Sequence, residues 1–286
     1  MIVVKLIGGL GNQMFQYATA RRLAIQHNTD LFLDCSGFAK DPLRNYELDI
    51  FNVHASIATP EILRNVSFIR KWHHINSIFS KENKIRYVKE QTINFDKDIL
   101  SLPDNVYLDG YWQSEKYFLD ISDYIRNEFS FVRPLSPENK KLLHDIQSCN
   151  AVSVHVRRGD YFSNPETKKV HYVCDEEYYQ RAGAKIQKIL DRPEFFIFSD
   201  DPEWARQHVV PDGSVTYVSQ KNGTHNSEDM HLMSLCQHHI IANSSFSWWG
   251  AWLGKNEGQV VVAPERWYNI VKFSKLHCLP ENWMRI

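Results

Sequence analysis

The chain has 286 residues, long enough for one large domain or two ordinary ones, and its 43% hydrophobic and 23% charged residues exclude a disordered protein. Its 33 basic and 34 acidic residues give a net charge of −1. This balance argues against broad nucleic-acid binding, which usually shows as a basic surplus, so any basic site must be local.

The first part of the chain predicts an alternation of strands and helices. Apolar segments indicate strands at residues 2–6, 31–34 and 106–108. Helices are expected at residues 13–27 and from about 114 to 126. The opening segment therefore predicts a β-loop-α-β unit with a right-handed crossover. Residues 35–104 show a weaker pattern and no repeat.

Two prolines within residues 131–137 predict a domain boundary, which divides the chain into residues 1–134 and 135–286. Strands are expected beyond it at residues 151–156, 195–198, 215–218, 238–242 and 260–263. Helices are expected at residues 137–148, 175–190, 227–237 and 247–254, with another beginning near Pro202. Strands that alternate with helices predict a parallel sheet. The simplest α/β architecture is two Rossmann-like domains facing a central cleft.

Three of these strands stop abruptly in polar or charged residues, within segments 151–161, 195–201 and 239–253. In an open α/β sheet, ligands bind in the crevice outside the carboxyl ends of the strands. The three strand ends together carry the adjacent arginines Arg157 and Arg158, the adjacent aspartates Asp200 and Asp201 and a serine-rich helix start. They therefore predict a pocket for an anionic ligand.

The first strand end carries Arg157 and Arg158 directly before a glycine. Alternate residues of a strand share a face, so His155 and Arg157 are expected together while Val154 and Val156 pack inward. Each guanidinium offers a planar fork of donors suited to phosphate. Two of them could neutralise a diphosphate without a metal. The alternative is a structural ion pair with Asp160.

The segment from Asn243 to Ser247 follows a strand and opens a helix. Serine hydroxyls and unpaired backbone N–H groups at a helix N-terminus favour an anion. The alternative is that each serine only caps the helix. Trp248, Trp249 and Trp252 fit core packing better than a sugar-binding platform.

Ser199 is followed by Asp200 and Asp201 at the end of another apolar strand. Such a pair could hold magnesium on a phosphate, or could accept the N–H donors of guanine. One of the two could instead cap the helix that begins near Pro202. The glycine-rich turn from Gly8 to Asn12 lacks GxGxxG spacing, although its glycines permit close backbone approach to a ligand.

Compartment and metal chemistry follow from other patterns. The five cysteines are odd in number and scattered without a CxxC pair, which favours a reducing compartment. The chain opens with an expected strand and not a secretion signal, and no apolar run could span a bilayer. We expect a cytoplasmic protein and leave open a peripheral membrane association. No HExxH-type spacing occurs among the 13 histidines, so we expect no metal site.

Five motifs, in order along nearly the whole chain, resemble the α-1,2-fucosyltransferase family of bacteria and animals, glycosyltransferase family 11. They are GGLGNQMFQYA (8–18), GYWQSEKYF (110–118), HVRRGDY (155–161), SDD (199–201) and NSSFSWWGAWL (243–253). The chain is similar to the bacterial members because it lacks the membrane stem of the animal ones.

The resemblance implies a GT-B fold that holds the donor, GDP-β-L-fucose, mainly in the second domain. It implies inversion at the anomeric carbon, no cofactor and no obligatory metal. Arg157 is expected to bind the donor diphosphate with support from Arg158, and His155 and Asp201 to lie near guanine or ribose. The expected catalytic residues are Arg157, Arg158 and Asp160. The expected GDP-fucose-binding residues are His155, Arg157, Asp200, Asp201, Asn243, Ser244, Ser245, Phe246, Gly9, Gly11, Asn12 and Gln13.

The expected acceptor is a galactose-terminated glycan fucosylated at O2, with α-1,3 transfer the nearest competitor. Asp109, Glu115 and Asp160 are candidates for the general base, because a carboxylate within hydrogen-bond reach of the hydroxyl would suit. Two other classes of protein compete. A nucleotide hydrolase is disfavoured because no GxxxxGK[ST] loop occurs, and a non-catalytic glycan-binding protein would have no use for paired arginines.

Overall fold

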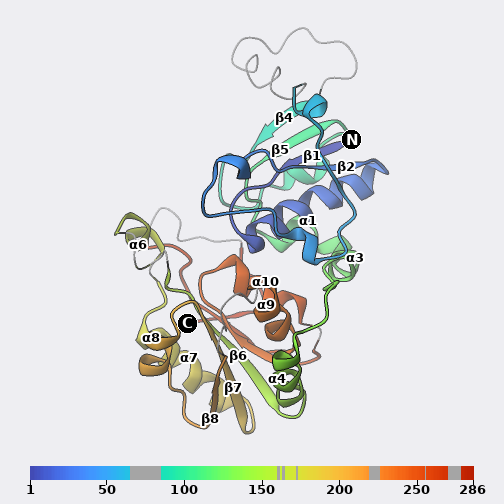
Figure 1. Cartoon of the computed structure of the whole chain (residues 1–286). Coiled ribbons are helices and arrows are strands. Elements are labelled where there is room, and N and C mark those ends of the chain that lie inside the picture. The colour runs from blue at the N-terminus through green and yellow to red at the C-terminus, as the bar shows by residue number, and fades with distance from the viewer. Residues whose placement is uncertain are drawn as a thin grey trace. The chain divides into compact units, whose positions relative to one another are not determined.

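The computed structural model describes residues 1–64, 85–159, 162, 165–171, 173–218, 226–254, 256–269 and 278–286. The chain divides into two compact units, Met1–Val132 and Arg133–Ile286. Each unit contains one parallel sheet with helices packed on it (Figure 1). Within the ranges given above, none of the helices has both the length and the apolar composition that a membrane crossing requires.

The N-terminal unit is built on a five-stranded sheet in the order β3-β2-β1-β5-β4. Its strands are β1 (Ile2–Lys5), β2 (Leu31–Asp34), β3 (Ser56–Ile57), β4 (Arg86–Lys89) and β5 (Val106–Asp109). β2 and β3 follow β1 in the chain and lie on one side of it, whereas β4 and β5 come later and lie on its other side. The strand order therefore reverses between β1 and β5, and open α/β sheets bind ligands at such a switch point.

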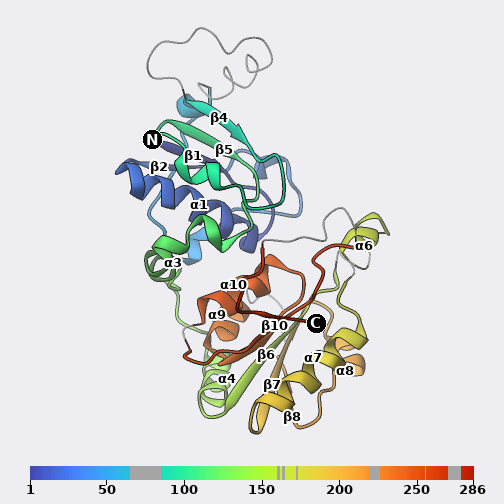
Figure 2. The same cartoon turned by 180° about the vertical axis from the view of Figure 1, so that it is seen from behind.

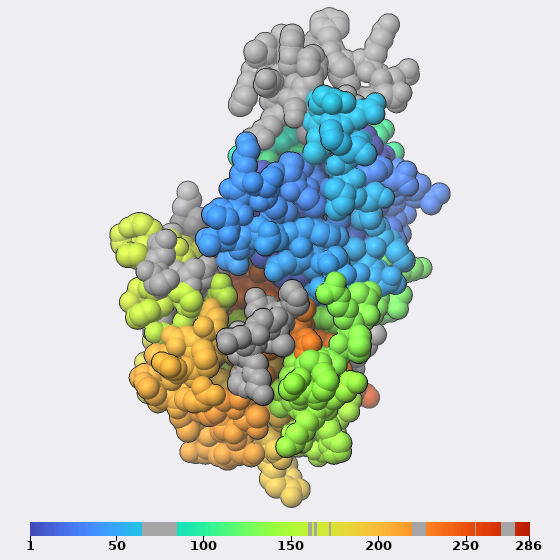
Figure 3. Space-filling model, viewed as in Figure 1, coloured from blue at the N-terminus to red at the C-terminus, as the bar shows by residue number. Residues whose placement is uncertain are grey.

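Helix α1 (Leu10–His27) covers one face of this sheet, and residues 35–64 run over one side of the unit (Figure 3). α1 begins at Leu10, three residues earlier than the hydrophobic pattern predicts, so Gly11 and Asn12 of the expected turn lie in the first turn of the helix. The 35–64 segment is fastened to α1 by side-chain hydrogen bonds, among them Gln13 Nε2 to the Asn45 carbonyl and the His54 N–H to the Tyr17 hydroxyl.

The single helix expected over residues 114–126 is wrong. Two short 3-10 turns, Glu115–Tyr117 and Leu119–Ile121, precede helix α3 (Ser122–Glu128). Phe118, between the turns, has φ −142°, outside the helical range. Its ring is fully buried with its centroid 6.2 Å from that of Phe15. Packing of this ring outweighs the local helix propensity.

The C-terminal unit has a six-stranded parallel sheet in the order β11-β10-β9-β6-β7-β8. Its strands are β6 (Asn150–Val156), β7 (Pro193–Ser199), β8 (Ser214–Tyr217), β9 (His238–Ile240), β10 (Val261–Ala263) and β11 (Met284–Arg285). Counted from β6, this is the 3-2-1-4-5-6 order of a Rossmann fold, and its switch point lies between β6 and β9.

Helices cover both faces of this sheet (Figure 2). The helices are α4 (Pro137–Gln147), α6 (Pro165–His171), α7 (Glu176–Ile189), α8 (Pro202–His208), α9 (Asn226–Leu235) and α10 (Ser245–Leu253). Val152, Val154 and Val156 pack with α7 and α8, while Ala151 packs with α4 and α9. A parallel sheet buried on both faces is the expected arrangement. The prediction that Val154 and Val156 pack inward is confirmed, and His155 on the opposite face of β6 is buried as well.

The tryptophans of α10 belong to this core. Trp248 and Trp249 are fully buried, and Trp252 is 4% exposed. Their rings contact one another at centroid distances of 5.0–6.0 Å. The prediction of core packing is confirmed for all three.

Candidate active site

The switch point of the C-terminal unit brings the three polar strand ends together. β6 pairs with β7 on one side and with β9 on the other, with Val154 opposite both Ile197 and Ile240. Continuing these registers places the residues after β6, β7 and β9 next to one another at the carboxyl edge of the sheet. The sequence prediction that these ends meet therefore agrees with the pairing.

Arg157 and Asp200 form an ion pair at this edge. Arg157 Nη1 lies 3.0 Å from Asp200 Oδ2, and the two side chains are 25% and 24% exposed. The other oxygen of Asp200 accepts the backbone N–H of Arg158 at 2.8 Å. A Cβ at Gly159 would lie 2.7 Å from Asp200 Oδ2, so only glycine leaves room for this carboxylate. Asp160, the partner expected for an alternative pair, lies outside the described residues.

Arg158 is held inside the protein. Its side chain is 6% exposed, and its Nε lies 3.0 Å from Asp201 Oδ2. The guanidinium carbon is 4.1 Å from the ring centroids of both Phe162 and Trp204, close enough for cation–π attraction. This arrangement suits a residue that positions its neighbours more than one that touches a substrate.

Asp201 also begins helix α8, because its Oδ1 accepts the Trp204 N–H at 3.2 Å. The alternative that one aspartate of the pair caps a helix is therefore confirmed. Both carboxylates after β7 are already paired with arginines, which makes them poor ligands for magnesium. Among the residues that the structure describes, no three His, Cys, Asp or Glu side chains could hold a metal ion together.

The N-terminus of α10 follows the end of β9 and carries no neutralising group of its own. Ser244 precedes the helix in an extended conformation and makes no side-chain cap, and no acidic residue stands in the first turn. Ser247 donates its hydroxyl to the carbonyls of Ala242 and Ser244. The first N–H groups of a helix have no intrahelical acceptors, and the helix dipole adds partial positive charge there. This end of α10 can therefore bind an anion.

Asn243 links neighbouring segments through hydrogen bonds and is not an exposed hydrogen-bond donor. It is 1% exposed, and its Nδ2 donates to the carbonyls of His171 and Trp267 at 2.8 and 2.9 Å. Its Oδ1 accepts from Cys174 Sγ at 3.5 Å. Asn243 thus ties the segments after β6 and β10 to the end of β9. Its predicted contact with GDP-fucose stays a prediction.

His155 stands two residues before Arg157 on β6, with its ring centroid 5.5 Å from that of Phe246. Burial, with a smaller contribution from the Arg157 charge, lowers its pKa to about 3, so the imidazole is neutral at pH 7. Its buried Nδ1 has no hydrogen-bond partner among the described residues. An unsatisfied buried polar atom costs about 1–3 kcal/mol, which a ligand hydrogen bond could offset.

The glycine turn of the N-terminal unit is locked by Gln13. This side chain is fully buried, donates to the carbonyls of Gly8 and Asn45, and accepts the Glu47 N–H at 3.0 Å. A ligand role is therefore less suited to Gln13 than support of the turn. Gly9 lies beside a cation that sequence analysis missed, since a Cβ there would be 3.4 Å from Arg44 Nη1.

Arg44 belongs to residues 35–104, where no pattern marked it. Gly11 is buried in the first turn of α1, and Asn12 is half-buried.

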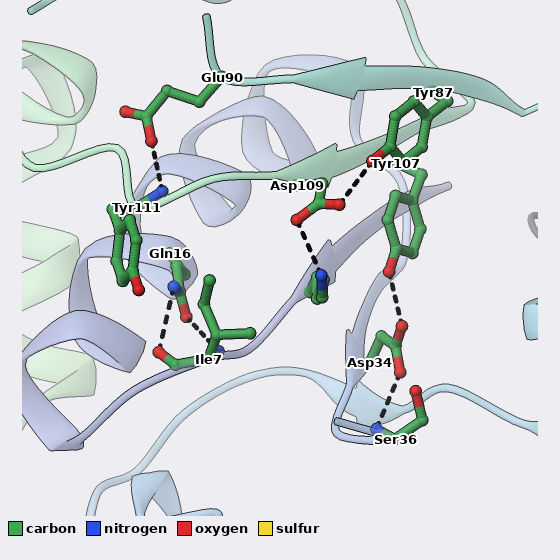
Figure 4. Close-up of polar contacts among 10 residues, drawn as sticks. Ile7, Gln16, Asp34, Ser36, Tyr87, Glu90, Tyr107, Asp109 and Tyr111 are labelled. Atoms are coloured by element: carbon green, nitrogen blue, oxygen red, sulfur yellow. Dashed lines mark hydrogen bonds and ion pairs between the residues drawn. The ribbon is translucent and has the colours of Figure 1, made fainter. Parts of the chain in front are cut away.

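Polar side chains also gather at the carboxyl edge of the N-terminal sheet (Figure 4). Asp109 lies 3.1 Å from Lys5 Nζ and accepts the Tyr87 hydroxyl at 2.5 Å. The Tyr107 hydroxyl donates to Asp34 at 2.6 Å. Asp109 has both oxygens engaged, which argues against it as the general base. Glu115 opens the first 3-10 turn after β5.

Glu90 is a further carboxylate at this edge that sequence analysis missed (Figure 4). It accepts the backbone N–H groups of Tyr111 and Trp112 at 2.6 and 3.1 Å. Burial raises its pKa above the ordinary range, although the two N–H donors oppose this. It directly follows β4, a strand that no sequence pattern marked, so no sequence signal pointed to Glu90.

Two α/β units, each built on a parallel sheet with a switch point, are the architecture of glycosyltransferases of the GT-B class. The family described as glycosyl transferase family 11 matches residues 1–286. The chain belongs to this family.

Two curated relatives are informative. An α-1,2-colitosyltransferase of Escherichia coli is 36% identical, over 100% of this chain and 99% of the relative. Galactoside α-(1,2)-fucosyltransferase 1 of Bos taurus is 25% identical, over 86% of this chain and 64% of its own length. The match therefore extends from bacterial to mammalian enzymes.

The crystal structure of the fucosyltransferase NodZ from Bradyrhizobium shares the fold. It aligns with a TM-score of 0.50 and 17% identity, over 87% of this chain and 91% of that chain. At this identity the likeness concerns the fold, and it supports the GT-B architecture.

Proposed function

We propose that the protein transfers L-fucose from GDP-β-L-fucose to the 2-hydroxyl of a β-galactoside, with inversion, to give an Fucα1-2Gal linkage. One observation carries the proposal: Arg157 follows β6 and the uncapped N-terminus of α10 follows β9, and these two strands are neighbours at the switch point of a Rossmann sheet. Membership of family 11 and the galactoside specificity named for the bovine relative support it. Colitose, the sugar in the name of the bacterial relative, is fucose without its 3-hydroxyl.

In this mechanism the acceptor hydroxyl attacks C1 of fucose from the face opposite the diphosphate. The C1–O bond to phosphate breaks as the new glycosidic bond forms, and negative charge grows on the leaving GDP. Arg157 and the first N–H groups of α10 stabilise that charge as fixed donors. The neutral His155 packs on Phe246 next to these donors, and the two rings suit a contact with guanine or ribose.

The hydroxyl proton passes to a base. Of the three candidates, Asp109 is tied to Lys5 and Tyr87, so Glu115 and Asp160 remain. The donor belongs to the C-terminal unit, predicted as residues 135–286, and the acceptor to residues 1–134.

Metal ions are not required in this mechanism, because arginine and helix N–H groups supply the positive charge. Asp200 and Asp201 are occupied by Arg157 and Arg158. The reaction is proposed to run in the cytoplasm, with peripheral contact at the membrane where a surface glycan is assembled. All five cysteines are free thiols, which fits a reducing compartment.

The test is incubation of the protein with GDP-fucose and a panel of β-galactosides, followed by linkage analysis of the product. The expected result is fucose on O2 of galactose, in the α configuration. Product at O3, or sugar release without an acceptor, would contradict the proposal. A parallel reaction with GDP-colitose shows whether the 3-hydroxyl of the donor is recognised.

A further inference from the structure

The loop after β5 is shaped by one carboxylate from the neighbouring strand end. Glu90 follows β4, and its side chain accepts the N–H groups of Tyr111 and Trp112, at 2.6 and 3.1 Å. A Cβ at Gly110 would lie 2.4 Å from the Glu90 Cβ, so glycine is needed for this close approach. Residues 110–113 are thus fixed to the edge of the sheet through Glu90.

The loop is held in an unfavourable conformation. Trp112 has φ +55°, in the left-handed region that a bulky side chain rarely adopts. It is 1% exposed, and its indole Nε1 has no hydrogen-bond partner among the described residues. Backbone strain of this kind costs about 1–3 kcal/mol and is concentrated at functional sites. The contacts of Glu90 oppose that cost.

The loop places two side chains at the β1–β5 switch point. The Tyr111 side chain is 43% exposed, although it is a large aromatic residue. Gln113 donates its Nε2 to Asn12 Oδ1 at 2.7 Å, which joins the loop to the first turn of α1. An exposed aromatic ring beside side-chain amides can pack on the apolar face of a sugar while the amides bond its hydroxyls.

We propose that residues 110–113 form the docking site for the galactose ring of the acceptor, and that Glu90 is the positioning residue that holds this loop in shape. Tyr111 packs against the C–H face of the ring, and Gln113 with Asn12 bonds its hydroxyls. This inference rests on the proposed function, because it takes the acceptor to be a β-galactoside.

Glu90→Gln is the first test, in the full chain, with Glu61→Gln as the matched control. Glu61 is an exposed glutamate of the same unit. The amide introduced at position 90 keeps one acceptor oxygen and turns an NH2 group toward the second backbone N–H. The variant should show faster hydrogen exchange at the Tyr111 and Trp112 amides. The acceptor KM should rise about tenfold or more, while the KM for GDP-fucose stays within about twofold.

Tyr111→Ala and Tyr111→Phe form the second test, because an exposed side chain can be removed with little effect on folding. Alanine should raise the acceptor KM about tenfold, and phenylalanine should restore it, since the ring makes the contact.

The inference is overturned if the wild-type enzyme fucosylates galactosides but Glu90→Gln opens the loop without changing the acceptor KM. It is also overturned if Tyr111→Ala leaves the acceptor KM unchanged, or if the loss falls equally on donor and acceptor. A wild-type protein that transfers nothing to any β-galactoside would instead contradict the proposed function.

Discussion

Asp200 Oδ2 lies 3.0 Å from Arg157 Nη1 in an ion pair, and this carboxylate occupies the space that a side chain at Gly159 would fill. The pair is about a quarter exposed, so the guanidinium is oriented without being sealed from a ligand. A diphosphate arriving at this edge would meet a cation whose direction is already set. Asp200 therefore orients Arg157, and Gly159 leaves the space that this contact needs.

Arg157→Ala should lower kcat by at least about 10²–10³, the loss seen when one fixed donor to a developing charge is removed. Stability should change little because the side chain is partly exposed. Steady-state kinetics against a galactoside gives the measurement. Arg181→Ala on α7, whose side chain is 57% exposed, is the control and should keep full activity. A folded Arg157→Ala enzyme with near-normal turnover would remove Arg157 from the mechanism.

Arg158→Met should act on stability instead. It removes one partner of a largely buried ion pair and a cation held between two rings. Breaking a fully buried pair costs about 3–5 kcal/mol, and the 37% exposure of Asp201 reduces this to on the order of 2 kcal/mol. Urea unfolding measures the loss, and calorimetry should show GDP affinity retained. A stable variant that no longer binds GDP would show that Arg158 touches the nucleotide.

Gly159→Ala should reduce turnover about tenfold or more while leaving most of the stability intact. The added methyl group would displace Asp200 and thereby turn the Arg157 guanidinium away from its direction. Gly37→Ala is the matched control, because the nearest atom to a Cβ there is 3.9 Å away. Equal activity of the two variants would show that the orientation of Arg157 is unimportant.

Stability of the C-terminal unit should fall in acid because of two buried histidines. Burial lowers the pKa of His155 and of His239 to about 3, while an unfolded histidine titrates near 6.5. Between these two values the histidines are protonated in the unfolded state and neutral in the folded state. The free energy of unfolding therefore decreases as pH falls from about 6.5 toward 3. Each group contributes a slope of about 1.4 kcal/mol per pH unit.

Unfolding free energies measured between pH 5 and 8 test this. His155→Phe should remove one of the two contributions and flatten the slope by about one proton. An unchanged slope would mean that His155 is charged in the folded state.

Activity should survive EDTA. The carboxylates that could bind magnesium at the strand edge are paired with arginines, and Arg157 with α10 neutralises the leaving group. Assays with and without the chelator should agree within about twofold. Loss of activity that magnesium or manganese restores would assign Asp200 and Asp201 to a metal.

Much of the C-terminal unit could be predicted from sequence because its strands are buried on both faces and appear as continuous apolar runs. Residues 193–199 and 150–156 are examples. β3 and β4 were missed because they are short and partly exposed, so no apolar run marks them. β11 has two residues and forms only by pairing with β10.

The site residues also divide into those that a local sequence pattern marks and those that it does not. Arginine and aspartate at strand ends were found because charge after an apolar run is visible in sequence. Asn243 and Gln13 were predicted to bind the donor, yet their amides bond backbone carbonyls such as that of Trp267, 24 residues away. No local pattern reveals such partners. Glu90 was missed because its role depends on β4 and β5 being neighbours.

Six of the eight tryptophans lie in residues 133–286, and those of α10 are packed against one another. Intrinsic fluorescence therefore reports chiefly on the C-terminal unit. Far-ultraviolet circular dichroism reports on the helices of both units. A denaturation series recorded by both signals would show, without any label, whether the two halves of the enzyme melt together or one after the other.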